Sequence, residues 1–304
     1  MNILQLLTLT LGKTTPVLLA CMGGLLSELS GVINFALEGM MLTGAFFAVW
    51  LTYSSGSPWI GLLGAAAGGT LIGILHSLVC LRFRANQIVS SIALNLLAAG
   101  ASGMLLNQVF QVYGTSPTVE KLPALNQLGI GRLPFLGEIL ASGAGELSIL
   151  VPLSILFNLA LIAFLKWSVW GLRLKACGEN PLAAKAAGLS VNRIRFLAIS
   201  TGGALAGVGG AYLAIGELST FVEQMTQGRG YLAIAALILG RWRPFGILPA
   251  TLFFGLSGAF SEWLAVRWTG LPYQLFLALP YAVCLGVLLF QMDKKQPPSA
   301  LGRV

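Results

Sequence analysis

The sequence predicts an all-α protein, a single polytopic membrane bundle of about eight to ten transmembrane helices that fills residues 1–304. The first observation is composition: hydrophobic residues make up 56% of the chain and charged residues only 9%. Soluble domains carry about 25% charged residues. The second observation is that apolar runs of spanning length, about 20 residues, recur from end to end. Together these observations indicate a chain whose body lies in a bilayer.

Nine apolar runs are predicted to be the membrane helices. In chain order they are 12–28, 34–54, 58–81, 88–109, 148–168, 196–215, 229–240, 244–266 and 273–291. The first run carries Pro16 and polar residues, which interrupt its apolar pattern. The seventh is too short to cross a bilayer at about 1.5 Å per residue. We therefore expect the seventh either to begin earlier or to be a broken helix buried inside the bundle.

The charges of the connections predict the orientation of the bundle. If the spans alternate in direction, 13 of the 18 lysines and arginines fall on one side of the membrane. Cytoplasmic loops are enriched in these residues, so this side and the C-terminus are predicted to be cytoplasmic, with the N-terminus outside. Two connections are long: a cytoplasmic loop over 169–195 and an extracytoplasmic loop over 110–147.

Composition and motifs exclude several functions. The net charge of +8 is spread between apolar runs rather than gathered with aromatic residues in a basic patch, so no nucleic-acid partner is expected. The four cysteines lack metal-ligand spacing, and one histidine and one aspartate leave little for catalysis. The segment LTLTLGKTT around Lys13 lacks the first glycine and the preceding strand of a phosphate loop. We therefore expect no enzyme activity and no metal in this chain.

The cytoplasmic loop contains a short helix signal, GENPLAAKAAGLSVNRIR, at 178–195. Asn180 is a favourable N-cap, Pro181 suits the first helical position, and Gly188 supplies a left-handed stop. A helix of two turns is unstable alone in water and must pack against something. Its small, alanine-lined side suits insertion into a groove on another protein. The alternative is a helix that lies on the bilayer surface.

Polar residues within the spans are the candidates for a translocation path. Gln87, Ser91 and Asn95 recur every four residues and form one stripe on the fourth span. In lipid, such a stripe must either line a water-filled route or hydrogen-bond to neighbouring helices, and the sequence leaves both open. Asn34 and Glu38 are further candidates. For Glu38, a structural pairing inside the bundle is favoured over a gating role.

Small residues recur every four positions in two spans. Gly64 and Gly68 lie in the third span, and Gly203 and Gly207 lie in the sixth. This spacing lets helix backbones approach closely. It predicts tight packing in a bundle that can slide between two states. The lone His76 of the third span is predicted to be a packing residue rather than a proton relay.

The stretch at 178–189 resembles the cytoplasmic coupling segment of ABC-importer permeases, which docks into the partner ATPase. Three other stretches resemble signatures of the ribose and branched-chain amino-acid permease superfamily, in the same order. They are SGVINFALEGMMLTGAF at 30–46, NQIVSSIALNLLAAG at 86–100 and GRGYLAIAALILGRWRPFG at 228–246. Within that superfamily, the chain looks closest to the nucleoside and simple-sugar permeases.

The resemblance implies a type II-like permease of an ATP-driven importer in a bacterial inner membrane, translocating nucleosides or simple sugars. It implies three protein partners: ABC ATPase subunits, a second and paralogous permease, and an extracytoplasmic substrate-binding lipoprotein. ATP and magnesium would bind to the ATPase, so this chain itself needs no cofactor. The residues expected to couple it to the ATPase are Glu179, Asn180, Pro181, Ala183, Ala184 and Gly188.

Two alternatives stay open. The first is an ABC permease for branched-chain amino acids or another small polar solute. The second is a secondary transporter acting alone, which would need ion-coupling carboxylates or an inverted repeat within the membrane. No clear repeat is visible in the sequence, and its acidic residues within the spans are few.

Overall fold

The computed structural model of the chain is a bundle of helices, and it describes residues 3–128, 146–268, 272–290 and 297–303. The long helices are α1 (Ile3–Leu29), α2 (Leu37–Ser55), α3 (Pro58–Ser77), α4 (Gln87–Phe110), α6 (Leu150–Trp167), α9 (Val191–Ala211), α11 (Pro244–Arg267) and α12 (Tyr273–Phe290). Three are shorter: α7 (Val169–Glu179), α8 (Pro181–Ala186) and α10 (Arg229–Leu239). Two π-helical segments, η1 (Leu78–Arg82) and η5 (Tyr212–Leu218), extend α3 and α9. The described residues contain no β-strand.

Each of the nine predicted spans corresponds to one of these helices. Among the described residues, six helices are long and apolar enough to cross a membrane: α1, α3 with η1, α4, α6, α9 with η5, and α11. The first begins at Ile3 instead of residue 12 and continues through Pro16. The prediction of an all-α polytopic membrane bundle is thus confirmed. The part of the predicted outer loop at 129–145 lies outside the described residues.

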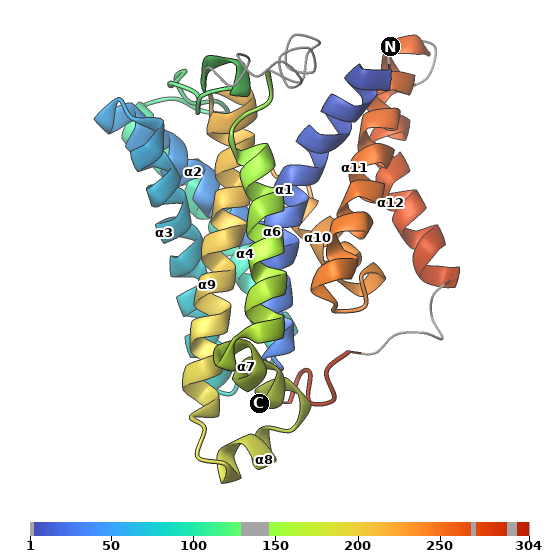
Figure 1. Cartoon of the computed structure of the whole chain (residues 1–304). Helices are drawn as coiled ribbons and strands as arrows, with labels where there is room; N and C mark the ends of the chain where they lie inside the picture. The colour runs from blue at the N-terminus through green and yellow to red at the C-terminus, as the bar shows by residue number, and fades with distance from the viewer. Residues whose placement is uncertain (1–2, 129–145, 269–271, 291–296, 304) are drawn as a thin grey trace.

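The helix α10 is a broken helix within the bundle, as one of the two alternatives for the seventh run predicted. Its 11 residues rise only about 16 Å, roughly half the thickness of a bilayer's hydrocarbon core. The six residues from Leu232 to Leu237 are all buried. It packs against α1 and α11 (Figure 1). A half-length helix is stable there because its ends meet protein rather than lipid.

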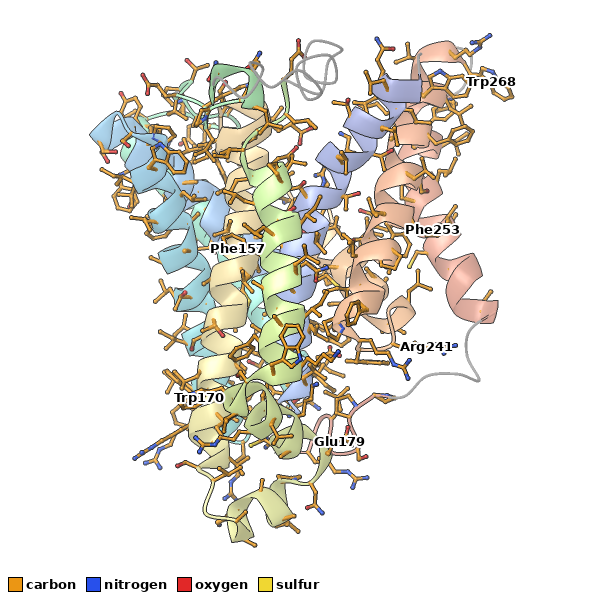
Figure 2. All side chains as sticks on the ribbon, viewed as in Figure 1. Phe157, Trp170, Glu179, Arg241, Phe253 and Trp268 are labelled. Atoms are coloured by element: carbon orange, nitrogen blue, oxygen red, sulfur yellow. The ribbon has the colours of Figure 1, made fainter. Side chains whose placement is uncertain are left out.

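The two ends of the bundle differ in what they carry. The N-terminus and the end of α11 lie at one end, and α7, α8 and the C-terminus lie at the other, which we call the α8 end (Figure 1). Trp268 is at the first end, whereas Trp170, Glu179 and Arg241 are near the α8 end (Figure 2). Between them, the sides of the bundle are apolar and exposed, as expected of a surface that meets lipid.

The centre of the bundle is α9, which packs against α1, α2 and α3. Glycines make this possible, because their backbones touch those of the neighbouring helices. A Cβ atom at Gly207 would collide with the backbone of Ala65, and one at Gly203 with the backbone of Gly69. Gly202 and Gly23 meet in the same way. The close packing predicted from the spacing of small residues is therefore present.

We predict that Gly207→Ala destabilises the protein, although alanine favours helix by about 1 kcal/mol over glycine. The added methyl group has no space, and overpacking typically costs about 1–3 kcal/mol. The matched control is Gly100→Ala on α4, where an added Cβ meets nothing within 4 Å. Thermal unfolding in detergent should give a lower melting temperature for Gly207→Ala and an equal or higher one for Gly100→Ala. An unchanged melting temperature for Gly207→Ala would contradict the packing.

Candidate functional site

The short helix α8 projects from the α8 end of the bundle (Figure 1). Asn180 caps it, because its backbone is extended and its Oδ1 accepts a hydrogen bond of 3.0 Å from the amide of Ala183. Pro181 occupies the first helical position, and Gly188 ends the turn with φ of +82°. The predicted cap and stop are confirmed. At six residues, the helix is shorter than the two turns that the sequence indicated.

The two faces of α8 have different neighbours. Ala184 is only 4% exposed and turns toward the protein, where α8 packs on α7 and α9. Leu182 is 79% exposed, and Ala183 and Lys185 are also exposed. The outward surface of α8 therefore carries an exposed leucine beside a small alanine. The sequence singled out the alanines and missed Leu182, because its outward direction depends on how α8 sits on α7.

The C-terminal tail, residues 297–303, fastens the base of α8 to the bundle. Ser299 donates a hydrogen bond of 2.8 Å to the Glu179 carboxylate, and the Ala300 amide donates to the carbonyl of Gly178. The buried guanidinium of Arg195 donates to the carbonyls of Ser30 and Arg303, at 3.0 Å each. Glu179, predicted to be a coupling residue, thus holds the tail in this structure. Movement of α8 would be transmitted to the start of α9 and to the α1–α2 connection.

The polar stripe of α4 lies against the irregular segment between α1 and α2. Gln87 Oε1 accepts from the amide of Ile33 at 2.7 Å, and Ser91 Oγ accepts from that of Phe35 at 3.1 Å. Asn95 Oδ1 accepts from Gly39 at 2.8 Å. All three side chains are more than 90% buried. In this structure, the three side chains form hydrogen bonds with a neighbouring segment, which was one of the two alternatives. Their role in a translocation path stays a prediction.

Asn34 and His76 complete the hydrogen bonding of that segment. The Oδ1 of Asn34 accepts from the amide of Ala36 at 3.1 Å, which holds the turn before α2. The two ring nitrogens of His76 lie 3.0 Å from Ser90 Oγ and 3.1 Å from the carbonyl oxygen of Ile33. Both residues are fully buried. The surroundings of His76 are those of a packing residue.

Glu38 holds the start of the broken helix α10. Its two carboxylate oxygens accept hydrogen bonds of 2.7 Å from the amides of Gly228 and Gly230. The first amides of a helix have no partner within the helix, and a carboxylate there is also favoured by the helix dipole. Gly230 allows the approach, because a Cβ there would touch the backbone of Glu38. This is the structural pairing that the sequence favoured for Glu38.

A cluster of charges between α1, η5 and α11 is the main feature that the sequence did not reveal. Lys13 Nζ lies 3.2 Å from a Glu262 oxygen and 3.5 Å from a Glu217 oxygen. Arg229, at the start of α10, donates to the carbonyls of Met225 and Thr226. The sequence offered one signal of this cluster, namely the position of Lys13 inside an apolar run, because a charge within the membrane requires a partner. Its partners could not be named, because they are far away in the chain.

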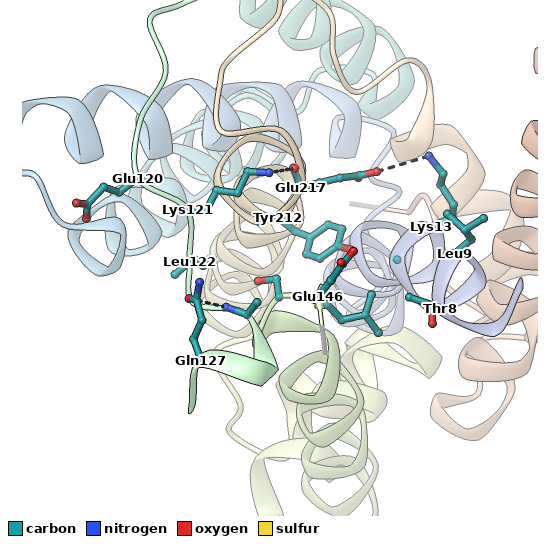
Figure 3. A pocket seen from close by; sticks show the side chains of 15 residues that line it. Thr8, Leu9, Lys13, Glu120, Lys121, Leu122, Gln127, Glu146, Tyr212 and Glu217 are labelled. Carbon is teal, nitrogen blue, oxygen red and sulfur yellow. Dashed lines mark hydrogen bonds and ion pairs between the residues drawn. The ribbon is translucent and has the colours of Figure 1, made fainter. Parts of the chain in front are cut away.

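Two cavities flank Lys13. The larger, of about 550 Å³, opens between α1, η5 and the outer loop, and it is lined by both acids and bases, among them Glu120, Lys121 and Glu146 (Figure 3). Tyr212 also lines this cavity. The smaller, of about 130 Å³, lies among α1, α10, α11 and α12. Charges of both signs therefore line each of the two cavities, and Lys13 lines both.

Comparison with known proteins identifies the family. The sequence pattern described as the branched-chain amino acid transport system permease component matches residues 6–290. The chain belongs to this permease family. It is 33% identical to the guanosine ABC transporter permease protein NupQ of Bacillus subtilis, over 99% of this chain and 98% of the relative. It is also 33% identical to the nucleoside ABC transporter permease protein NupC of Lactococcus lactis, over 95% and 92%.

Other relatives are more distant or cover less of this permease. TsgC13 of Haloferax volcanii, provisionally named a glucose ABC transporter permease, is 33% identical over 84% of this permease and 76% of the relative. Bacillus subtilis and Lactococcus lactis each have a second relative, NupP and NupB, at 27% and 26% identity. Both of these cover 81% of this permease and 70% of the relative. The resemblance to the nucleoside and simple-sugar permeases is confirmed.

We predict that Asn95→Leu lowers the melting temperature of the permease by several degrees. The change removes the acceptor for Gly39 and the donor to Phe35, and a buried polar group without a partner costs about 1–3 kcal/mol. The control is Asn107→Leu on the same helix, since the side chain of Asn107 makes no hydrogen bond with a described residue. Thermal unfolding and solute uptake should be measured together. Loss of uptake at an unchanged melting temperature would favour a path role for Asn95.

Proposed function

We propose that this permease is one membrane subunit of an ATP-driven importer in a bacterial inner membrane, and that it moves nucleosides or simple sugars inward. The observation that carries this proposal is the end-to-end relationship to proteins named as guanosine and nucleoside permeases. Separate ATPase subunits would bind ATP and magnesium and hydrolyse the ATP. Transport would proceed by alternating access, in which the bundle opens first to one side and then to the other.

The distribution of cations supports a cytoplasmic position for α8 and the C-terminus. Cytoplasmic ends of membrane helices collect lysine and arginine. Among the described residues, the cations in or beside the elements at the α8 end are Arg82, Arg84, Lys166, Arg173, Lys175, Lys185, Arg193, Arg195, Arg241, Arg243 and Arg303. The opposite end has few, among them Lys121 and Arg267. The N-terminus would then be extracytoplasmic.

We infer that the ATPase binds the permease through α8. The helix projects from the bundle, its outer side is small, and the exposed Leu182 could fill a pocket on a partner. Asn180, Pro181 and Gly188 would fix its shape, Ala183 would contact the ATPase, and Ala184 and Glu179 would hold its base. Because α8 leads directly into α9, its motion would reach the glycine contacts of α9 with α1, α2 and α3.

The remaining partners are a second permease and a substrate-binding lipoprotein. Bacillus subtilis and Lactococcus lactis each have two named relatives of this permease, which supports a paralogous partner and hence a heterodimer. The binding protein would deliver the solute at the end opposite α8. The cavity of about 550 Å³ opens there, beside the predicted outer loop.

A branched-chain amino acid is the second candidate solute, and one observation favours it. Lys13 and Glu262 present opposite charges beside the smaller cavity, which could meet the carboxylate and ammonium groups of a zwitterion. However, these two charges already pair with each other at 3.2 Å, so an amino acid would have to break that ion pair. A nucleoside or a sugar is uncharged and would not need to. The same pairing weakens the secondary-transporter alternative, which requires carboxylates free to bind an ion.

The solute is testable with the assembled complex. We predict that ATP hydrolysis by the purified importer with its binding protein, reconstituted in lipid, rises several-fold with nucleosides or with simple sugars. The same measurement with leucine tests the amino-acid alternative. Stimulation by leucine alone would overturn the proposed solute class but not the importer. Solute uptake that persists after removal of the ATPase subunits would overturn the importer itself.

For the docking role, we predict that Leu182→Glu abolishes co-purification of the ATPase and reduces uptake at least tenfold. A charge in a desolvated apolar pocket costs several kcal/mol, and each 1.4 kcal/mol is a factor of ten in affinity. Because Leu182 is 79% exposed in the permease alone, the melting temperature of the isolated permease should not change. Arg303→Ala, another exposed side chain at the same end, is the control. Normal ATPase binding by Leu182→Glu would refute docking through α8.

A further inference from the structure

A groove at the α8 end of the bundle combines apolar walls with two arginines. It lies between the end of α3, including η1, and the first turns of α9, and its volume is about 390 Å³. Leu78, Leu81, Phe196 and Leu197 supply most of its wall, and Arg82 and Arg193 line it as well. We propose that this groove binds an anionic phospholipid, with an acyl chain along the leucines and the phosphate between the two guanidinium groups.

The two arginines have no neutralising partner among the residues that the structure describes. Both side chains are exposed, and neither forms an ion pair or a hydrogen bond with a residue that the structure describes. Two like charges that line one groove repel each other, and a phosphate between them would remove that repulsion. Guanidinium groups also match phosphate oxygens in geometry, because they can donate two parallel hydrogen bonds. The missing partner is therefore an anion.

The apolar wall indicates that this anion belongs to a lipid. Leu78 is 43% exposed and Leu197 is 49% exposed, and both border the groove. Free phosphate would gain nothing from these side chains, whereas each methylene group of an acyl chain that they bury adds to its binding. Basic residues above an apolar groove between helices are the arrangement expected for a phospholipid at the headgroup level.

The backbone of η1 changes the direction in which Arg82 projects. In this π-helical turn the amide of Phe83 donates to the carbonyl of Leu78, and that of Ala85 donates to Val79. Such a turn holds one residue more than an α-helical turn, so the side chains that follow point differently, and π turns are frequent at functional sites. The irregularity occurs at the residue that would hold the phosphate.

A neighbouring groove shows what the apolar wall alone would offer. It lies among α1, α6, α7 and α9 on the other side of Leu197, and its volume is about 410 Å³. Its wall includes Leu161, Phe164 and Trp170, but no lysine or arginine lines it. One cation lies beside this second groove, because the guanidinium of Arg173 is 5.4 Å from the centre of the Trp170 ring. Two arginines line the first groove, so we expect the stronger preference for anionic lipid there.

The test compares two phospholipids with identical chains on the purified full-length permease. Native mass spectrometry would measure the binding of dioleoyl phosphatidylglycerol and dioleoyl phosphatidylcholine. We expect phosphatidylglycerol to bind at least tenfold more tightly, since two cations near the headgroup both attract its net negative charge. The double variant Arg82→Gln, Arg193→Gln should lose this preference. The control Arg241→Gln, Arg243→Gln removes equal charge at the same end and should keep it.

Four outcomes would overturn the proposal. The first is equal binding of the two lipids to the unaltered permease. The second is a preference for phosphatidylglycerol that the Arg82, Arg193 variant retains. The third is a loss of this preference in the control variant as large as that in the Arg82, Arg193 variant. The fourth is weaker ATPase co-purification with unchanged lipid affinity in the Arg82, Arg193 variant, which would assign the groove to a protein interface. Melting temperatures of both double variants verify that the protein stays folded. None of these outcomes depends on which solute is transported.

Discussion

A buried backbone amide without a hydrogen-bond partner costs several kcal/mol in a membrane protein, and this constraint organises the bundle. Among the described residues, the segment between α1 and α2 and the one before α10 are irregular, so some of their amides and carbonyls are left without helical partners. Side chains replace the missing bonds. Gln87, Ser91 and Asn95 serve the first interruption, and Glu38 serves the second. This requirement explains why these four polar side chains lie within the bundle.

The same constraint connects the two interruptions to each other. Asn95 Nδ2 donates both to the carbonyl of Phe35 and to the hydroxyl of Tyr231 on α10, at 2.9 and 3.0 Å. Trp242, just after α10, donates to the buried carboxylate of Glu28 near the end of α1. The irregular parts of the chain are therefore held as one unit. A conformational change that moves α10 must also strain the α1–α2 connection, which is where Arg195 and the C-terminal tail attach.

Glycine contacts and polar contacts have complementary roles in such a protein. The glycine backbones of α9 meet α1, α2 and α3 without interlocking side chains, so the helices can shift with little repacking. The polar contacts are specific, and they hold the α1–α2 connection and the start of α10 in one position relative to their neighbours. If α8 moves as proposed, α9 would shift along its glycine contacts, while the hydrogen-bonded segments would move as rigid bodies. This division suits a bundle that alternates between two states.

By itself, the sequence determined the fold class, the positions of nine of the helices that the structure describes, and the cap and stop of α8. These depend on apolar length and on interactions between residues a few positions apart, as between Asn180 and Ala183. The tertiary structure alone decided that Ala184 faces inward, that Lys13 pairs with Glu217 and Glu262, and that Glu38 caps α10. Glu38 and Gly228 are 190 positions apart, and no local pattern encodes such a pairing. It follows from the packing of whole helices, which the summed contacts of many side chains determine.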